Sequence, residues 1–379
     1  MDKIPFNKPH LTGNETAYIK EAVSSGKISG NGTFTKKCQA FFRERYGFKK
    51  ALLTTSCTDA LEMCALLADI QPGDEVIIPS YTFVSTALAF VRQGAVIKFA
   101  DSRPDHPGID EESIESLISD RTKAIVPVHY AGIACDMDLI MNLANQYDLL
   151  VIEDAAQAIE SNYKGQSLGS IGHLAAFSFH ETKNINAGEG GLLAINDDRF
   201  IGRSEIIWEK GTNRAAFFRG EIDKYGWVDT GSSFLPSELT AAFLWAQIEN
   251  LEKIQQRRKQ IWNLYYDRLS ILKHDFGIQL PVIPDYATNN GHMFYLVCKS
   301  EEQRIGLIDY LMNSNILAVF HYQSLHKSNY YKDRYEGPEL PNADKYTDRL
   351  VRLPFYYMLS DDEIERITDL VNQYFSQSP

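Results

Sequence analysis

Short apolar runs alternate with amphipathic segments from residue 51 onward, and this alternation limits the fold most strongly. The runs with the length and composition of buried strands are Ala51–Thr54, Glu75–Ile78, Val96–Phe99, Ala124–Val128 and Leu149–Ile152. The periodicity between them predicts helices over residues 57–69, 82–93, 110–119 and 136–147. Strands and helices that alternate at this spacing predict an α/β fold whose largely parallel sheet is covered on both faces. In such sheets, ligands bind at the carboxyl ends of the strands.

A second, smaller unit is predicted towards the C-terminus. A helical pattern runs from Pro236 to Leu269, and we interpret it as a connecting helix. A strand near residues 293–298 and helices near 302–313 and 360–375 follow it. We therefore predict a large domain over residues 1–240 and a small α/β domain over residues 241–379.

Composition excludes several classes of function. The 379 residues carry a net charge of −12, which disfavours nucleic acid as a partner. The longest apolar stretch, Leu52–Ile70, is interrupted by Asp59 and Glu62 and is not a membrane span. The N-terminus has no apolar signal core. The five cysteines are scattered, which fits reduced thiols better than disulfides or a zinc site. We expect a cytoplasmic protein without a metal.

Lys183 is the first candidate for a chemical role. It lies in the segment Phe177–Asn184, which runs on into Gly188–Gly191. Glycines allow the backbone to approach a ligand closely, and a lysine nucleophile needs a sheltered pocket. A solvated lysine in a loop, with the glycines as a turn before a strand at Leu192–Ile195, is the alternative. The segment alone leaves both interpretations open.

Asp154 and Gln157 favour the chemical interpretation. Asp154 follows the apolar run Leu149–Ile152, and a buried carboxylate needs a partner if it is to ionise. The protonated nitrogen of a pyridine cofactor is such a partner. Gln157 is placed to donate a hydrogen bond to a hydroxyl of the same ring. The alternatives are a helix N-cap for Asp154 and an ordinary residue of the first helical turn for Gln157.

An anion site is predicted where a helix begins after the first strand. Ser56, Cys57, Thr58 and Asp59 open this helix, so free amides and hydroxyls there can bind a phosphate. Plain N-capping is the alternative. The segment is neither a Walker loop nor a GxGxxG fingerprint. Phe83 follows the next strand, where an aromatic ring either stacks on a flat cofactor or packs in the core.

These residues, in this order, resemble the DegT/StrS family of sugar-nucleotide aminotransferases. The resemblance spans nearly the whole chain, from Ile4 to Phe355. Its most specific motif is Phe177–His180 with Lys183 and Gly188–Gly191. Other shared stretches are Pro79–Thr86, Val126–Gly132 and Glu209–Arg214. The resemblance implies the aspartate-aminotransferase-like architecture, fold type I, of enzymes that use pyridoxal 5′-phosphate.

The resemblance also implies a role for each matching residue. Lys183 is the Schiff-base lysine and later moves the proton between the cofactor carbon and the substrate carbon. Asp154 pairs with the pyridine nitrogen, Gln157 contacts the ring hydroxyl and Phe83 stacks on the ring. Residues at positions that bind the phosphate are Thr58, Asp59 and Ser178, beside Cys57 of the predicted anion site.

One position departs from the family pattern. Family members commonly add an asparagine from the second subunit to the phosphate site, within a Gly-x-Asn-Tyr-Arg motif. The matching stretch here is Gly231–Leu235, with Ser233 in place of the asparagine. The contact across the subunits is therefore expected to be weaker, or to be made differently.

The implied activity is amination of a nucleotide-linked keto sugar. The expected substrates are dTDP-4-keto-6-deoxyglucose and glutamate. The expected product is a dTDP-4-amino-4,6-dideoxyhexose of galacto or gluco configuration, for bacterial surface polysaccharides such as the O-antigen of lipopolysaccharide. A homodimer with active sites at its interface is also implied.

Three alternatives remain to be weighed. Amination at C3 of the sugar is not opposed by any residue. A dehydratase of the same family has histidine in place of the lysine, and the presence of Lys183 argues against it, since His180 lies three positions too early. A non-catalytic regulator that binds the cofactor is disfavoured because no basic segment suited to reading DNA is found.

Overall fold

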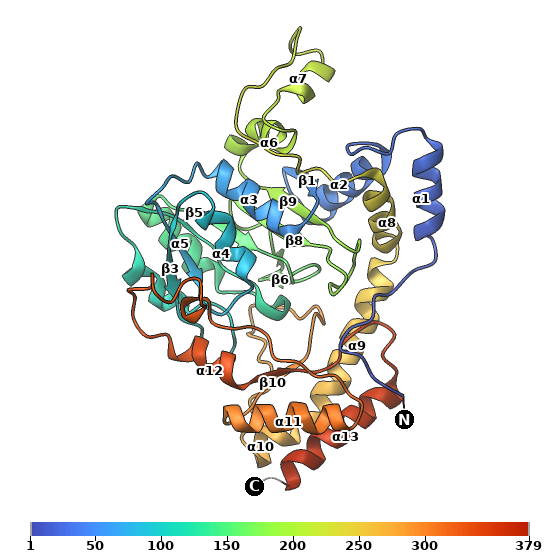
Figure 1. The fold of residues 1–379 in the computed structure, drawn as a ribbon, viewed down its shortest axis with the longest axis vertical. Helices are drawn as coiled ribbons and strands as arrows, with labels where there is room; N and C mark the ends of the chain where they lie inside the picture. The colour runs from blue at the N-terminus through green and yellow to red at the C-terminus, as the bar shows by residue number, and fades with distance from the viewer. Residues whose placement is uncertain (1, 378–379) are drawn as a thin grey trace.

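A seven-stranded sheet forms the centre of the computed structural model, which describes residues 2–377 (Figure 1). Its strands are β1 (Lys50–Thr54), β2 (Glu75–Pro79), β3 (Val96–Ala100), β4 (Thr122–Ile125), β5 (Leu150–Asp154), β8 (Leu174–Ser178) and β9 (Gly191–Ile195). They lie in the order β1-β9-β8-β5-β4-β2-β3. The strands from β3 to β8 in this order pair in parallel, and β9 is antiparallel to both of its neighbours. The predicted α/β class with a mostly parallel sheet is confirmed.

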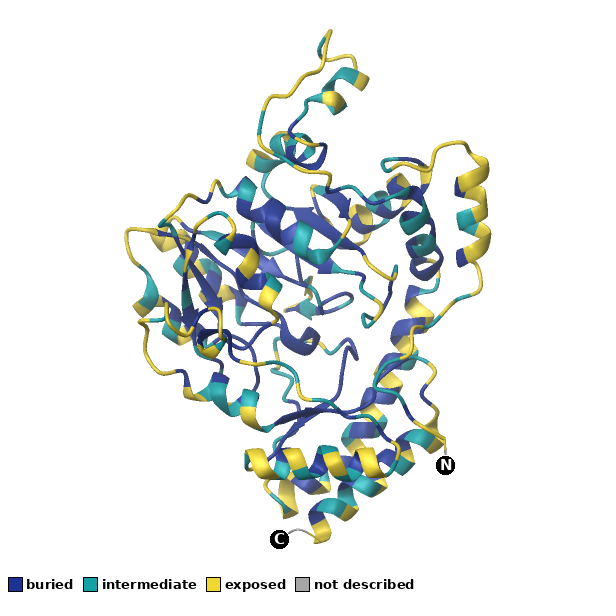
Figure 2. Ribbon diagram, in the orientation of Figure 1, coloured by how far each residue is buried: buried dark blue, intermediate teal, exposed yellow. Residues whose placement is uncertain are grey.

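Helices cover both faces of this sheet because neighbouring strand residues face opposite apolar layers. Leu52 packs with α3 (Cys57–Leu67), α4 (Val84–Val91) and α6 (Ile201–Trp208). The next residue, Leu53, packs with the layer of α2 (Thr33–Tyr46), α5 (Met137–Tyr147) and α8 (Glu238–Ile248). Figure 2 shows the strands almost entirely buried. A sheet buried on both sides explains why its strands appear in the sequence as continuous apolar runs.

Two predicted elements differ from the structure. Residues 110–119 were expected to form a helix, but the structure has only a 3₁₀ helix, η1 (Glu111–Leu117). The buried carboxylate of Glu111 accepts the Asp136 N–H at 2.6 Å and pairs with Arg103, so tertiary contacts fix a shorter turn there. The single helix expected after Pro236 is two helices, α8 and α9 (Leu251–Leu269). They separate at Asn250, whose backbone N–H bonds to Gln247 in a tight turn.

The C-terminal residues form a separate apolar layer below the sheet in Figure 1. Strands β10 (Tyr295–Val297) and β11 (Leu350–Arg352) pair antiparallel there. The helices of this part are α9, α10 (Ile271–Asp275), α11 (Glu301–Asn313), α12 (Pro341–Arg349) and α13 (Asp361–Gln377). Ile4 of the N-terminal segment also packs in this layer. The proposed division into domains at residues 240 and 241 stays a prediction.

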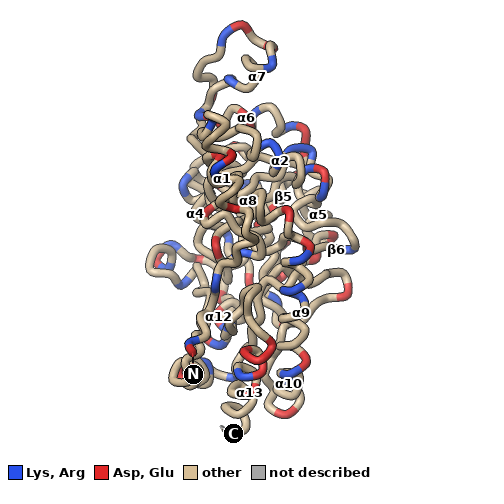
Figure 3. Tube along the Cα trace, turned by 90° about the vertical axis from the view of Figure 1, so that its right-hand side faces the viewer, with Lys and Arg blue, Asp and Glu red and all other residues tan. Residues whose placement is uncertain are grey.

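The remaining elements are short or lie outside the central sheet. They are α1 (Glu15–Ser24), the short pair β6 (Asn162–Tyr163) and β7 (Gln166–Ser167), η2 (Tyr130–Gly132), η3 (Asp198–Phe200), η4 (Leu325–Lys327) and α7 (Arg214–Phe218). The segment that carries α7 projects away from the body of the molecule (Figure 1) and is largely exposed (Figure 2). We call residues 213–228 the arm. Figure 3 shows basic and acidic residues interspersed along the Cα trace. Within residues 2–377, no helix has the length and apolarity needed to cross a membrane.

Candidate active site

The carboxyl ends of parallel strands β5 and β8 lie side by side in the middle of the sheet, and Asp154 is the last residue of β5. Its side chain is buried; Oδ2 accepts from Thr86 Oγ1 at 2.7 Å and Oδ1 from the Ala156 N–H at 3.1 Å. Burial raises the pKa of Asp154, against the lowering effect of these hydrogen bonds. No helix begins directly after β5, so the N-cap interpretation of Asp154 is wrong. Its carboxylate is a buried acceptor that needs a cation to stay ionised.

Gln157 lies in the turn that follows β5, and its side chain is held from both ends. Oε1 accepts from the Ala131 N–H at 2.6 Å, and Nε2 donates to the hydroxyl of Tyr322 at 3.2 Å. Asn290 donates to the Gln157 carbonyl at 2.7 Å and fixes the backbone. Because the turn is not helical, Gln157 is not a first-turn helix residue. Its amide N–H group is fixed as a donor beside Asp154.

Lys183 lies in the loop between β8 and β9, and its backbone N–H bonds to the His180 carbonyl at 2.9 Å. Ser178, the last residue of β8, opens the same loop. Burial lowers the pKa of Lys183 to about 8; the charge of Arg352 adds to this effect, and Cys57 and Asp154 oppose it. An ordinary surface lysine would keep its full hydration. The amine of Lys183 is instead sheltered and partly neutral near pH 7.

The beginning of α3 lies against the beginning of β9. Ser56 caps the helix by accepting the Asp59 N–H at 3.1 Å, and Thr58 Oγ1 lies 2.8 Å from Ser85 Oγ. A Cβ added at Gly191 would collide with the Ser56 carbonyl and lie 2.5 Å from the Cys57 nitrogen. Glycine is therefore needed for this close approach. The cap uses the amide of Asp59 and leaves the helix N-terminus able to bind an anion.

Phe83 is at the N-terminus of α4, and its side chain is 54% exposed. Its ring centroid lies 5.7 Å from that of Tyr322. An exposed ring of this kind does not serve core packing. It forms a wall that a flat ligand can stack against.

These residues line one cavity of about 460 Å³. The predicted site residues that line it are Cys57, Thr58, Phe83, Asp154, Gln157, Ser178 and Lys183. Asp59 is not brought into it, since its carboxylate turns back to the hydroxyls of Thr55 and Ser56. Ser233 also lies elsewhere, in an exposed bridge with Glu209. The phosphate contacts predicted for Asp59 and Ser233 stay predictions.

Sequence reasoning missed the residues that close the cavity from the other side. They are Phe6, His292, His321, Tyr322 and Arg352, from the N-terminal segment and the C-terminal part. Arg352 had a local signal, because it is a single charged residue inside the apolar run Leu350–Phe355. Tyr322 and the two histidines lie in segments without any distinctive pattern.

The cavity fits pyridoxal phosphate. The Asp154 carboxylate forms no ion pair with any residue in 2–377, so a ring nitrogen carrying a proton would compensate its charge. The Gln157 amide is a donor for the ring hydroxyl, and Phe83 offers an aromatic face. The α3 N-terminus, with hydroxyls of Thr58, Ser85 and Ser178, suits a phosphate. The Lys183 amine lines the same space.

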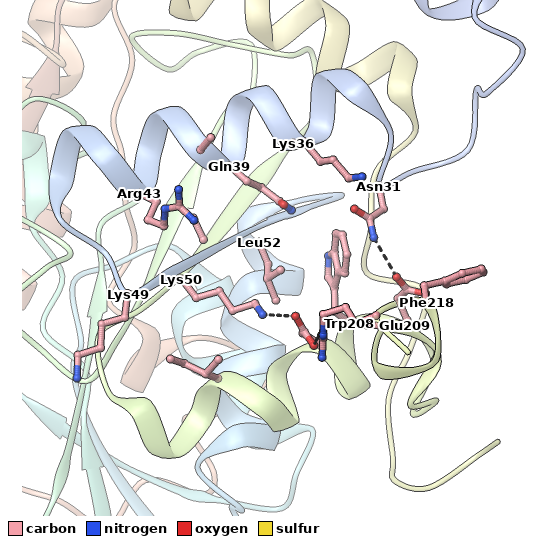
Figure 4. Close-up of a pocket in the computed structure, with 16 residues that line it drawn as sticks. Asn31, Lys36, Gln39, Arg43, Lys49, Lys50, Leu52, Trp208, Glu209 and Phe218 are labelled. Atoms are coloured by element: carbon pink, nitrogen blue, oxygen red, sulfur yellow. Dashed lines mark hydrogen bonds and ion pairs between the residues drawn. The ribbon is translucent and has the colours of Figure 1, made fainter. Parts of the chain in front are cut away.

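A second cavity, of about 610 Å³, lies between α2 and α6 (Figure 4). Lys36, Arg43 and Lys50 line it together with Trp208 and others, and none of the predicted site residues does. Lys50 pairs with Glu205, and Asn31 donates to Glu209 at 3.3 Å. Of the lining carboxylates, Glu205 pairs with both Lys50 and Arg219. We assign no chemistry to this cavity.

Comparison with known proteins gives one consistent result. The sequence pattern of the DegT/DnrJ/EryC1/StrS aminotransferase family matches residues 9–372. Over 379 residues, the chain is 32% identical to the spore coat polysaccharide biosynthesis protein SpsC of Bacillus subtilis, with 97% of this chain and 96% of SpsC covered.

Solved structures agree with this. The PMP form of the putative sugar aminotransferase Spr1654 from Streptococcus pneumoniae has a TM-score of 0.91 and 26% identity, and covers 99% of both chains. Its PLP form has a TM-score of 0.90 and 25% identity over the same share. DesV from S. venezuelae has a TM-score of 0.90 and 28% identity over 100% of both chains.

Proposed function

The chain belongs to the DegT/DnrJ/EryC1/StrS aminotransferase family, and on that premise we propose that it transfers an amino group from glutamate to dTDP-4-keto-6-deoxyglucose. It is a pyridoxal-phosphate-dependent sugar aminotransferase with the fold of the known sugar aminotransferases. The proposed product is a dTDP-4-amino-4,6-dideoxyhexose of galacto or gluco configuration. Similarity to SpsC supports a role in making a polysaccharide.

The observation that carries the proposal is one pair of side chains. The sheltered amine of Lys183 and the buried, cation-free carboxylate of Asp154 line the same cavity. Pyridoxal phosphate supplies an aldehyde, which forms covalent bonds with amines, and a pyridine ring, which accepts electrons. A lysine and a carboxylate that line one cavity serve the two ends of that chemistry.

Each residue has a role that follows from its contacts. Asp154 keeps a proton on the ring nitrogen by compensating its charge, while Thr86 and the Ala156 N–H hold the carboxylate in place. Gln157 donates to the ring hydroxyl and orients the ring. The hydroxyls of Thr58 and Ser178 and the α3 amides hold the phosphate.

Lys183 acts twice. Its lowered pKa makes the amine available as a nucleophile, and once released it moves a proton between the reacting carbons. The donor leaves its amino group in the site and departs as a keto acid before the sugar is aminated, because Lys183 serves both half-reactions. We therefore propose ping-pong kinetics.

We also propose a homodimer whose active sites lie at the interface. The arm exposes Phe218 (68%), Tyr225 (52%) and Trp227 (82%), and exposed apolar groups gathered on one projection are typical of protein interfaces. Ser233 lies just beyond the arm and does not line the active-site cavity of its own subunit. This position suits a contact with the other subunit. A cytoplasmic location is proposed as well, supported by five unpaired cysteines.

The test uses purified enzyme with pyridoxal phosphate and glutamate. It is incubated separately with dTDP-sugars that carry the keto group at C4 or at C3, and the products are identified by NMR. We expect an amine at C4, axial or equatorial, from the 4-keto sugar alone. Amination of only the 3-keto sugar would contradict the proposed substrate, and amination of neither would contradict the use of dTDP-sugars.

A further inference from the structure

His292 is a buried histidine of the active-site cavity, and none of the roles proposed above uses it. It lies in the segment before β10, is 4% exposed and lines the same cavity as Lys183. Its backbone is held on both sides. The N–H donates to Oδ1 of Asn290 at 3.0 Å, and the carbonyl accepts from Nη2 of Arg258 at 2.7 Å. The position of the imidazole is therefore fixed before any ligand binds.

The side chain of Asn184 decides which nitrogen of the imidazole carries the proton. Its amide nitrogen donates to the backbone carbonyl of Asn290 at 3.0 Å and to Oε1 of Gln255 at 2.8 Å. Because a backbone carbonyl can only accept, the atom of Asn184 that lies 2.8 Å from Nδ1 of His292 is its oxygen, Oδ1. Nδ1 therefore carries the proton and donates it to this oxygen.

The imidazole is neutral, so its other nitrogen, Nε2, keeps a lone pair. Burial lowers the pKa of His292 well below the usual 6.5, and the positive charges of Lys183, Arg258 and Arg352 lower it further. A neutral imidazole with its proton on Nδ1 is a hydrogen-bond acceptor at Nε2. Nε2 forms no hydrogen bond with any residue in 2–377, whereas the other polar atoms of His292 are all bonded. It is the atom that His292 can offer to the cavity.

The other histidines that line the cavity already use their acceptor nitrogen. Nδ1 of His321 accepts from Nη1 of Arg352 at 3.0 Å, and Nδ1 of His180 accepts from the Thr182 N–H at 3.3 Å. Among the histidines described in residues 2–377 that line this cavity, only His292 keeps an unused acceptor for a group inside it.

Lys183 is well placed to donate to this acceptor. It directly precedes Asn184, whose side chain holds the imidazole, and its own side chain lines the same cavity of about 460 Å³. Its charge is also the strongest electrostatic influence on His292. A buried amine needs acceptors for its N–H groups, since unmet hydrogen bonds are costly away from water.

We propose that Nε2 of His292 accepts a hydrogen bond from the Lys183 amine once this amine has left the cofactor, and so directs its lone pair at the carbon that loses a proton. This inference rests on the proposed function. An amine has two N–H groups and one lone pair, so holding one N–H limits where the lone pair points. When the C–H bond of the amino donor breaks, the proton goes to this lone pair and Lys183 becomes an ammonium. The electron pair of the bond passes into the pyridine ring. The hydrogen bond to His292 then strengthens, because its donor is charged.

The first experiment compares two variants that each keep one half of the imidazole. The amide of His292→Asn reaches the position of Nδ1, so this variant keeps the bond to Asn184 and loses the acceptor in the cavity. The longer His292→Gln places an oxygen near the position of Nε2, so it keeps the acceptor and loses the bond to Asn184. The reaction of the holoenzyme with glutamate alone is followed by stopped-flow absorbance in a single turnover.

His292→Asn is expected to lower the maximal rate of this half-reaction about 10- to 100-fold and to leave the half-saturating glutamate concentration unchanged. His292→Gln should keep most of the wild-type rate. If His292 only supported the fold through Asn184, the order would be reversed, with His292→Gln the slower variant, and that result would overturn the inference. A higher half-saturating concentration in His292→Asn with an unchanged maximal rate would also overturn it.

The second experiment needs no reaction. Cofactor-free protein with ¹⁵N-labelled histidine is studied by NMR, and the signals of His292 are assigned by their loss in His292→Asn. We expect a proton on Nδ1 and none on Nε2 at pH 7, and a shift of the Nε2 signal in Lys183→Ala, because the donor is removed. The control Lys36→Ala should leave the signal unchanged, since Lys36 lines the other cavity.

The two experiments separate the inference from the proposed function. If glutamate did not react with the wild type, the proposed amino donor would be wrong, and the NMR signals would still decide the role of His292. A proton on Nε2, or an Nε2 signal that is the same in Lys183→Ala as in the wild type, would overturn the inference.

Discussion

Lys183 and Asp154 carry groups that water normally keeps charged, yet both lie inside one cavity. Burial shifts the two pKa values towards the neutral forms, down for Lys183 and up for Asp154. A bound pyridine ring that carries a proton would restore the charged form of Asp154. The site is therefore arranged around a ligand, and without one the charged forms of its buried groups are disfavoured.

The pH dependence of Lys183 can be measured directly. With a pKa of about 8 in place of the usual 10.5, about a tenth of the amines are neutral at pH 7. Labelling of the cofactor-free protein with an amine-reactive reagent, followed by peptide mass spectrometry, should give a midpoint near 8 for Lys183. In Arg352→Gln the midpoint should move upwards, because a nearby positive charge is removed. A midpoint of 10.5 in the wild type would contradict the sheltered amine.

The variant Asp154→Asn should separate activity from stability. Loss of the carboxylate is expected to lower kcat about 100- to 1,000-fold. The pKa of Asp154 is raised on folding, so wild-type stability falls as pH rises from the usual 3.8 through the folded value. An asparagine does not ionise, so the stability of the variant does not fall with pH in this way. Its side chain can still form hydrogen bonds with Thr86 and Ala156. In urea unfolding at pH 7 without cofactor, it should be at least as stable as the wild type; a clear loss of stability would contradict the argument.

At the scale of elements, the site exists because β5 and β8 are parallel neighbours that end at the same edge of the sheet. Asp154 and Ser178 are their final residues, and the loop from β8 to β9 brings Lys183 to the same edge. The N-terminus of α3 joins them only because Gly191, the first residue of β9, has no side chain. The sequence left Gly188–Gly191 open between close approach to a ligand and a turn; Gly191 instead begins β9 and permits the contact of strand and helix.

The variant Gly191→Ala tests this contact. The new Cβ meets backbone atoms of Ser56 and Cys57, which cannot move aside as a flexible side chain would. We expect a loss of stability of about 1–3 kcal/mol and weaker binding of pyridoxal phosphate. Gly202→Ala on α6 is the matched control, because its Cβ would meet nothing within 4 Å. Urea unfolding and equilibrium dialysis measure the two effects, and equal behaviour of both variants would refute the prediction.

Local patterns predicted the sheet, Lys183, Asp154 and the α3 anion site, since apolar runs and the residues that end them are adjacent in sequence. The break at Asn250 was missed because apolar spacing continues through it. Tyr322 and Arg352 were missed for another reason. They reach Gln157 and the cavity from parts of the chain far away in sequence, and only the folded structure brings them there.

At the scale of the whole molecule, the arm is the feature that a single chain does not explain. Trp227 is 82% exposed although its indole N–H is bonded to the Asp229 carbonyl. We predict that Phe218→Glu combined with Trp227→Glu converts a dimer into a monomer, as measured by light scattering after gel filtration. Met312→Glu on α11, at the opposite end of the molecule (Figure 1), is the control. A dimer that survives the double substitution would show that the arm is not its interface.

The role of Lys183 is tested most directly by identifying the amine that forms a covalent bond with the cofactor. Wild-type enzyme and Lys183→Ala are each mixed with pyridoxal phosphate, reduced with borohydride, digested and mapped by mass spectrometry. We expect a single cofactor adduct on the peptide that contains Lys183, and no adduct in Lys183→Ala. An adduct on a different lysine, or an equal yield of adduct in the variant, would contradict it.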